Sequence, residues 1–229
     1  SWLAARGHET QAGFPEIHRP RAGEVSRVTT QPPVYSRDET PSAFLAGEFI
    51  RWLGEQDGSW FAHVSFLSPH PPFVVPAPFN TMYRPEDGPA FRRAASLEAE
   101  KAVHPFLAWD LLQKTKSSFV PGHKGKVVDW DDATLRQIRA LYWGMVSEVD
   151  WQLGRIWQAL RDAGAWEDTL IVLTSDHAEM LGEHFQLGKG GFHEGSYHIP
   201  LIIRDPRAAS SRGAKVEKFT EAVDVLPTA

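Results

Sequence analysis

One long segment with a regular apolar period constrains the fold of this 229-residue chain more than any other feature. Apolar residues recur there at steps of three and four: Leu135, Ile138, Leu141, Tyr142, Met145, Val149, Leu153, Ile156 and Leu160. This spacing places them on one face of an α-helix. Asp131 and Asp132 stand at its start and Gly164 at its end, where such residues favour helix boundaries. We therefore predict a helix of roughly 30 residues, ~45 Å long at 1.5 Å per residue.

Two unbroken apolar runs follow this helix, at residues 169–174 and 199–203. Such runs are typical of strands that are buried on both faces of a sheet. Upstream, Thr40 and Pro41 begin a second amphipathic helix, and residues 60–66 form a further strand candidate. Helices that alternate with buried strands predict an α/β fold, a sheet with helices on its faces. Residues 76–128 carry many Pro, Gly and Lys, with short helical pieces such as 94–103, and are predicted to be an irregular insertion.

The composition excludes several classes of protein. The chain has no Cys, so it contains no disulfide, no zinc–thiolate site, no iron–sulfur cluster and no cysteine nucleophile. Its 24 basic and 29 acidic residues give a net charge of −5, which argues against a nucleic-acid partner. No apolar run approaches the roughly 20 residues that a membrane span requires.

The candidate chemistry begins where the run 169–174 ends, at Ser175, Asp176 and His177. In open α/β sheets, ligands bind beyond the carboxyl ends of the strands. Asp and His side chains suit Mg, Mn, Ca or Zn. The alternative is that Asp176 caps the next helix and His177 is a polar neighbour without a ligand, and spacing alone leaves both interpretations open.

A glycine-dense loop follows the Asp-His pair and carries Lys189. Glycines let the backbone approach a ligand closely, and a lysine beside a metal suits an anionic substrate. The same loop holds His184, His193 and His198, each of which has the alternative role of a solvent-facing loop residue.

Together these segments resemble the sulfatases and phosphonate monoester hydrolases of the alkaline phosphatase superfamily. Residues 174–184 and 187–204 are similar to the C-terminal metal segment of that family. Residues 68–73 resemble its substrate-loop histidine, residues 141–150 its long helix, and residues 219–228 the helix that comes later. Residues 76–87 resemble the phosphonate monoester hydrolase branch in particular. The similarity covers most of residues 38–228.

The resemblance implies a fold and a set of roles. The fold would be a mixed, mainly parallel α/β sheet between helices, incomplete at both ends of this chain. Asp176 and His177 would be two ligands of a divalent metal ion (Mn, Ca, Mg or Zn). Lys189 would contact the anion and the nucleophile, and His70 would lie beside the leaving-group oxygen as a hydrogen-bond donor or general acid. The reaction would be hydrolysis of phosphonate or phosphate monoesters or diesters, or of sulfate esters, through a formylglycine nucleophile.

The chain departs from the family in three ways. It has neither the Cys-x-Pro-x-Arg motif that matures to formylglycine, nor a Ser substitute, nor the N-terminal strand with paired Asp ligands. Ala178 replaces the usual Gly and requires a negative φ. We therefore expect the nucleophile to lie outside this chain, which on its own would bind metal weakly and turn over no substrate. Arylsulfatase specificity and a non-catalytic module that lacks the nucleophile are the alternatives.

The remaining expectations concern organisation and partners. Both ends look like cuts within a longer protein, the alternative being a natural chain with a floppy tail. We expect one partial catalytic domain over residues 1–229: a loop-rich lead-in at 1–37, a helix, strand and loop with His70 at 38–75, the insertion at 76–128, and the long helix with the metal strand and its successor at 129–229. The expected partners are a small anionic ester and further copies in a homo-oligomer of the full-length protein, with no membrane span. The bacterial cytoplasm is favoured over the periplasm.

Overall fold

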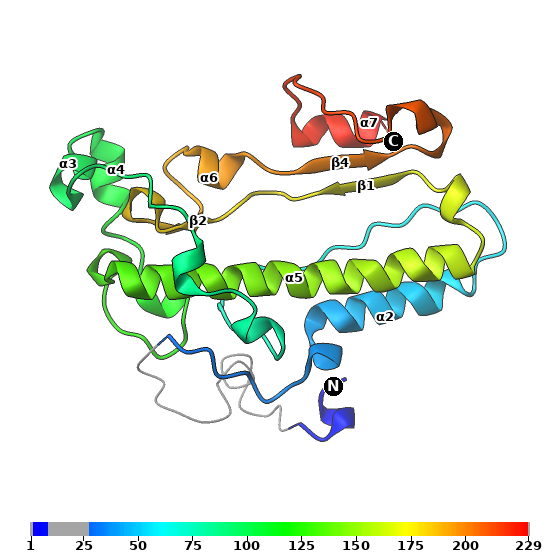
Figure 1. The fold of residues 1–229 in the computed structure, drawn as a ribbon, viewed down its shortest axis with the longest axis horizontal. Coiled ribbons are helices and arrows are strands. Elements are labelled where there is room, and N and C mark those ends of the chain that lie inside the picture. Colours follow the sequence, from blue (N-terminus) through cyan, green and yellow to red (C-terminus); the bar gives the residue numbers. More distant parts are fainter. Residues whose placement is uncertain (1, 9–27, 229) are drawn as a thin grey trace.

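The computed structural model describes residues 2–8 and 28–228, so residues 9–27 of the predicted lead-in lie outside the described part. The helices are α2 (Pro41–Leu53), α3 (Leu97–Lys101), α4 (Pro105–Asp110), α5 (Asp132–Asp162), α6 (Glu194–Tyr197) and α7 (Val225–Thr228). The strands are β1 (Ile171–Thr174), β2 (Met180–Leu181), β3 (Leu187–Gly188) and β4 (Leu201–Arg204). Helix α5 runs along the molecule, with α2 beside it on one side and the pair β1 and β4 on the other (Figure 1).

The two predicted long helices are confirmed, with the expected caps. The Asp131 carboxylate accepts the backbone N–H of Thr134 at the start of α5. The Thr40 hydroxyl accepts the N–H of Ala43 at the start of α2, and Pro41 is the first helical residue. Both caps satisfy backbone donors that a helix leaves without partners in its first turn. Local sequence chemistry therefore fixes where each helix begins.

Helices α2 and α5 pack through a core that we call the helix-pair core. Its buried members are Ala46, Phe49, Leu53, Ile156 and Leu160. A buried polar link lies beside it, where the Thr40 hydroxyl donates to Glu148 Oε1 at 2.6 Å and Gln152 Nε2 donates to the same oxygen at 3.0 Å. Burial raises the pKa of Glu148, and its hydrogen-bond donors only partly oppose that rise. The link joins the first turn of α2 to the middle of α5.

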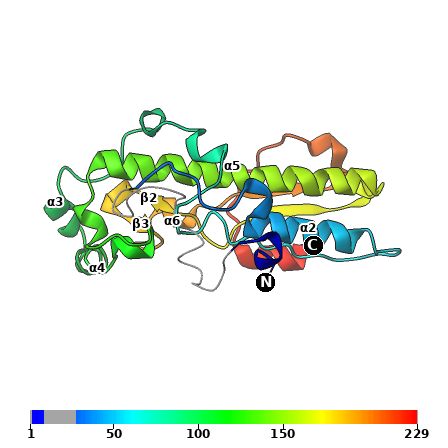
Figure 2. The same cartoon turned by 90° about the horizontal axis from the view of Figure 1, so that it is seen from below.

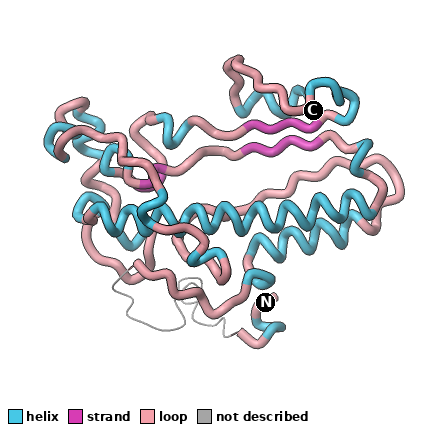
Figure 3. Tube along the Cα trace, in the orientation of Figure 1, coloured by secondary structure: helices cyan, strands magenta, loops and turns pink. Residues whose placement is uncertain are grey.

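The predicted mixed, mainly parallel sheet is not seen in the described residues, whose strands pair only antiparallel. Strand β1 pairs with β4 from Ile171 opposite Arg204 to Thr174 opposite Leu201, and β2 pairs with β3. A parallel pair needs a crossover connection, usually a helix that returns the chain to the same end. Here the chain reverses through a loop that contains only the hairpin β2–β3 and the single turn α6, so β4 returns beside β1 in the opposite direction (Figure 3).

The strand predicted at residues 60–66 is extended but lies in no sheet. Trp60, Ala62, Val64 and Phe66 pack against the helix-pair core, while Phe61 between them is 74% exposed. Within the described chain, no backbone hydrogen bond involves residues 57–66. The alternation of apolar side chains was therefore a correct signal for extended backbone. The alternation was not sufficient to predict a β-strand, because a strand also requires a partner segment with which its backbone forms hydrogen bonds.

Among the described residues, strand β1 has a partner strand, β4, on only one of its two edges. Strands β1 and β4 are also less buried than the apolar runs predicted, with Ile202 59% and Ile203 49% exposed. The expectation of burial on both faces is therefore wrong for this chain. A two-stranded sheet of this kind is marginal without further strands or helices against it.

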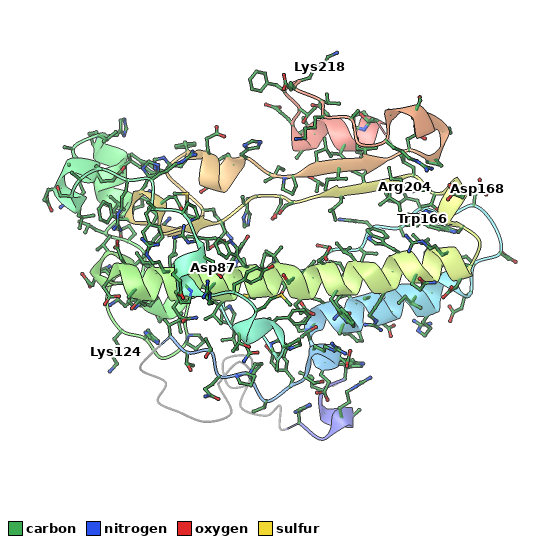
Figure 4. All side chains as sticks on the ribbon, viewed as in Figure 1. Asp87, Lys124, Trp166, Asp168, Arg204 and Lys218 are labelled. Atoms are coloured by element: carbon green, nitrogen blue, oxygen red, sulfur yellow. The ribbon has the colours of Figure 1, made fainter. Side chains whose placement is uncertain are left out.

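Arg204 fastens the far end of the β1–β4 pair to the helices (Figure 4). Its guanidinium lies 4.3 Å from the ring centroid of Trp166 and donates to the Thr169 carbonyl at 3.1 Å. Arg161, in the last turn of α5, contacts the same ring at 4.2 Å. Cation–π contacts of this type contribute about 0.5–2 kcal/mol each, depending on exposure. These contacts anchor the start of β1 beside the end of α5, and from there the strand runs toward α6 (Figure 1).

The insertion at residues 76–128 contains only short helical turns besides α3 and α4. It contributes to a second core under the β2–β3 hairpin, which we call the loop-side core. The buried members of that core are Phe73, Val75, Phe79, Phe119, Val120, Val127, Leu135, Ile138, Leu141, Met145, Leu181 and Leu187. The insertion and the first half of α5 therefore support the glycine-dense loop.

None of the described helices is both long and apolar enough to cross a membrane.

Candidate active site

Asp176 and His177 leave the end of β1 in a tight turn. The Asp176 Oδ1 atom accepts the backbone N–H of His177 at 2.9 Å, and Asp176 Oδ2 lies 3.6 Å from His177 Nε2. Partial burial raises the pKa of Asp176, but the nearby His177 and the hydrogen bonds it accepts outweigh this and bring the pKa below its usual value. The carboxylate is therefore ionised at neutral pH, as a metal ligand requires.

The ring of His177 is held in one orientation by its own loop. Its Nδ1 atom lies 2.9 Å from the Ala178 carbonyl, an acceptor only, so Nδ1 carries the proton. The other ring nitrogen, Nε2, faces the Asp176 carboxylate, 3.6 Å from Oδ2. A carbonyl on the distal nitrogen is a common way to orient a metal-ligating histidine. Ala178 is absent from the residues with positive φ, so it fits the turn in place of the usual glycine.

Lys189 lies on the loop that follows β3, and the backbone there has conformations that need glycine. Gly190 has φ +152° and Gly191 has φ +70°, both in the range that L side chains rarely adopt. The side chain of Lys189 is exposed, whereas Gly188 before it is buried. The backbone of the loop is therefore anchored next to Lys189, while the lysine side chain extends into solvent.

Ser196 joins the loop of Lys189 to the turn of His177. The Ser196 carbonyl accepts the N–H of Ala178 at 2.8 Å, and its hydroxyl contacts the N–H and the carbonyl of Gly190 at 3.3 and 3.4 Å. Ser196 itself is 1% exposed. One buried residue of α6 thus connects the turn that follows Asp176 and His177 to the loop that carries Lys189.

Glu179 is a site residue that sequence reasoning missed. Burial raises its pKa to about 7, while the charges of Lys189 and His177 act to lower it. Its Oε1 atom is buried and has no hydrogen-bond partner in the described chain. A buried carboxyl beside a cation marks a functional site more often than a random surface position does. The available signal was its place between the Asp-His pair and the buried residues Met180 and Leu181.

A polar cluster under the glycines was also missed. Lys114 Nζ donates to Gln186 Oε1 at 2.9 Å and lies 3.6 Å from Asp110 Oδ2. A Cβ on Gly190 would meet Asp110 at 3.2 Å and Lys114 at 3.4 Å. Burial lowers the pKa of Lys114, which Asp110 partly offsets. Asp110 and Lys114 come from α4 and the segment after it, so residues distant in the sequence support the Lys189 loop, and no local motif reveals them.

His70 is placed differently from the other three predicted site residues. Its Nδ1 atom lies 2.8 Å from the Pro71 carbonyl, and its N–H donates to the Leu67 carbonyl at 3.0 Å. Within residues 2–8 and 28–228, no hydrogen bond or ion pair joins it to Asp176, His177 or Lys189. The structure therefore links Asp176, His177 and Lys189 through Ser196 and leaves His70 on its own loop.

The donor atoms fit one side of a metal site. A carboxylate oxygen and an imidazole nitrogen suit a divalent cation. No group of three or more His, Cys, Asp or Glu side chains arranged to hold a metal occurs in the described part of the chain. Asp176 and His177 would supply two ligands, and a hard cation requires more oxygen donors than these.

Known proteins are similar in sequence to nearly the whole chain. A family model described as Sulfatase matches residues 5–229. The chain is 38% identical to the multifunctional alkaline phosphatase superfamily protein PehA of Trinickia caryophylli, over 99% of this chain and 45% of that protein.

Two solved structures of phosphonate monoester hydrolases are also similar to the chain. The enzyme of Agrobacterium radiobacter is 58% identical, with a TM-score of 0.96 over 99% of this chain and 45% of that one. The enzyme of Silicibacter pomeroyi is 37% identical, with a TM-score of 0.78 over 90% of this chain and 40% of that one. The chain spans less than half the length of these relatives. The match to the family model over nearly the whole chain shows that it belongs to the sulfatase family, with an alkaline-phosphatase-like fold.

Proposed function

We propose that this chain is part of a metal-dependent hydrolase of phosphonate or phosphate monoesters or diesters, or of sulfate esters. The observation that carries the proposal is the link through Ser196, which holds the Asp176–His177 turn and the Lys189 loop together. The names of the similar proteins support the phosphonate branch. Arylsulfatase specificity is the alternative within the family, because a lysine binds a sulfate and a phosphonate oxygen equally well.

The proposed roles follow from the chemistry of each side chain. A divalent ion, held in part by Asp176 and His177, would polarise the ester oxygens and make a nucleophile more acidic. Lys189 supplies a fixed positive charge where negative charge develops on the substrate. His70 is assigned to the leaving-group oxygen as hydrogen-bond donor or general acid, because imidazole exchanges a proton near neutral pH. Placing His70 there is part of the proposal and depends on parts of the site outside this chain.

We also propose that the formylglycine nucleophile and the remaining metal ligands come from outside residues 1–229. The chain has no Cys and covers less than half of its relatives. The unpaired edges of β1 and residues 60–66 are consistent with further strands that would complete a mixed, mainly parallel sheet. The segments 1–37, 38–75, 76–128 and 129–229 would then be parts of one partial catalytic domain, and the full-length protein would be a homo-oligomer. A non-catalytic homologue is the alternative from another class.

Removal of the metal tests this function in a longer protein that carries the chain. Stripping the divalent metal with a chelator is expected to lower kcat/KM for an aryl phosphonate monoester by at least about 100-fold, because the ion supplies Lewis-acid stabilisation. Separate re-addition of Mn²⁺, Mg²⁺, Ca²⁺ and Zn²⁺, with metal analysis of each sample, would identify the ion. Full activity in a sample shown to be metal-free would contradict the proposal.

A further inference from the structure

Four exposed aromatic side chains form a continuous strip next to the Lys189 loop. Phe106 and Trp109 come from α4, Phe192 from the glycine-dense loop, and Tyr197 from the end of α6. Their rings follow one another with centroid separations of 6.0 Å for Trp109–Phe106, 5.9 Å for Phe106–Phe192 and 5.8 Å for Phe192–Tyr197. We call these four residues the aromatic strip.

The strip is open to solvent although its members are large and apolar. Trp109 and Tyr197 are each 59% exposed, Phe192 is 78% exposed and Phe106 is 38% exposed. A soluble protein loses hydrophobic free energy by exposing adjoining aromatic surface, so such a patch commonly marks a binding surface. Aromatic rings also pack well against flat apolar groups, and Phe192 and Tyr197 are stacked with an interplanar angle of 23°.

The backbone of Phe192 has an unfavourable conformation, and its side chain is exposed to solvent. Its φ of +57° lies in the left-handed region, which costs a side chain with a Cβ free energy and which glycine adopts readily. Gly190 and Gly191 come just before it with positive φ. This backbone directs the Phe192 ring onto Phe106 and Tyr197 rather than into the core. A glycine would be the more stable residue at this position if the ring had no role.

Two residues of the aromatic strip, Phe192 and Tyr197, lie on the segments that form the candidate anion site. Phe192 follows Lys189 by three positions on the same loop. Tyr197 follows Ser196, the residue whose carbonyl binds Ala178 and whose hydroxyl contacts Gly190. The end of α6 and the α3–α4 region lie at the same end of the molecule (Figures 1 and 2). Lys189 and the aromatic strip are therefore carried by connected segments, an arrangement that suits a ligand with an anionic head and an apolar body.

We propose that the aromatic strip binds the organic group of the ester substrate and selects esters of aromatic or other bulky apolar alcohols. The proposal rests on the proposed function, because Lys189 is taken to hold the anionic part of the same molecule. Phe192 and Tyr197, the two rings tied to the Lys189 loop and the His177 turn, would make the first contact with that group. Phe106 and Trp109 would extend the surface for larger groups.

A selectivity measurement in the longer protein tests this proposal. Phe192→Gly removes the ring and keeps the left-handed backbone accessible, so a loss reports the ring rather than a distorted loop. The ratio of kcat/KM for a phenyl ester to that for the matching methyl ester is expected to fall about tenfold, chiefly through KM of the phenyl ester. Phe192→Tyr keeps the ring and should preserve the ratio. Val103→Ser, an exposed apolar residue outside the strip, should leave both rates unchanged.

A binding measurement separates failure of this proposal from failure of the proposed function. Benzenesulfonate and methanesulfonate carry the same anionic head and are not hydrolysed at the C–S bond, and their binding can be compared by NMR. Stronger binding of benzenesulfonate, lost in Phe192→Gly, supports the strip even if neither ester is turned over. An unchanged phenyl-to-methyl ratio together with equal binding of the two sulfonates would overturn it. So would a change of oligomeric state in Phe192→Gly without a change in selectivity, because the strip would then join two copies.

Discussion

Replacing Lys189 by Ala in the longer protein is expected to lower kcat/KM for an anionic ester by about 100- to 1,000-fold. Electrostatic groups fixed where charge develops in the transition state typically contribute this much. We expect Lys189 to be effective because glycines with positive φ and the contacts of Ser196 hold the backbone of its loop, while its exposed side chain can reach a substrate. We expect the loss mainly in kcat, because charge on the substrate oxygens increases as the reaction proceeds.

Two control variants make this prediction specific. Lys189→Arg keeps the charge and changes the shape of the donor group, so it should retain part of the activity that Ala loses. Lys215→Ala removes an exposed lysine near the end of the chain and should leave kcat/KM unchanged. A fall of less than about threefold for Lys189→Ala would show that the lysine has no role at the reacting centre.

Replacing Gly144 by Ala is expected to lower the free energy of unfolding by about 3 kcal/mol. A Cβ at this position would overlap the Phe79 carbonyl oxygen and lie 3.3 Å from Val75 Cγ1. The oxygen belongs to the backbone and cannot rotate away, so α5 must move from the turn that contains Phe79. Both contacts belong to the loop-side core under the candidate site. Thermal unfolding followed by circular dichroism should show a fall in Tm of roughly 6–12 °C.

Gly154→Ala in the same helix is the matched control. Apart from the adjacent residues and the backbone of its own helix, no atom of the described chain lies within 4 Å of the position where its Cβ would be placed. Ala is favoured over Gly in a helix interior by about 1 kcal/mol, so this variant should be slightly more stable than the parent protein. Equal Tm values for Gly144→Ala and Gly154→Ala would contradict the close packing of α5 against Phe79.

The sequence predicted the elements whose signals are local. Helix α5 was expected from its apolar period and its Asp131 cap, and α2 from Thr40 and Pro41, and both begin at those residues. Strand pairing was not predictable in the same way, because it depends on which segments meet in space. The alternating residues 60–66 show this: their pattern is that of a strand, yet the described chain gives them no partner.

The same distinction between local and long-range signals applies to the candidate site. Asp176, His177 and Lys189 were predicted from residue type and from the resemblance to a family, and Ser196 connects the segments that carry them. The roles of Ser196, Glu179 and Lys114 depend on burial and on contacts between distant segments, which a sequence pattern does not carry. The aromatic strip was missed for the same reason, since α4 and α6 are more than 80 residues apart.

The most direct test of the account is hydrolysis of an aryl phosphonate monoester by residues 1–229 alone, measured beside a longer protein that includes the nucleophile segment. The account predicts turnover by the longer protein and none by residues 1–229, because Asp176, His177 and Lys189 form only part of the site. Circular dichroism on residues 1–229 would verify that the helices are folded during the assay. Appreciable turnover by residues 1–229 that disappears in Lys189→Ala would contradict the account.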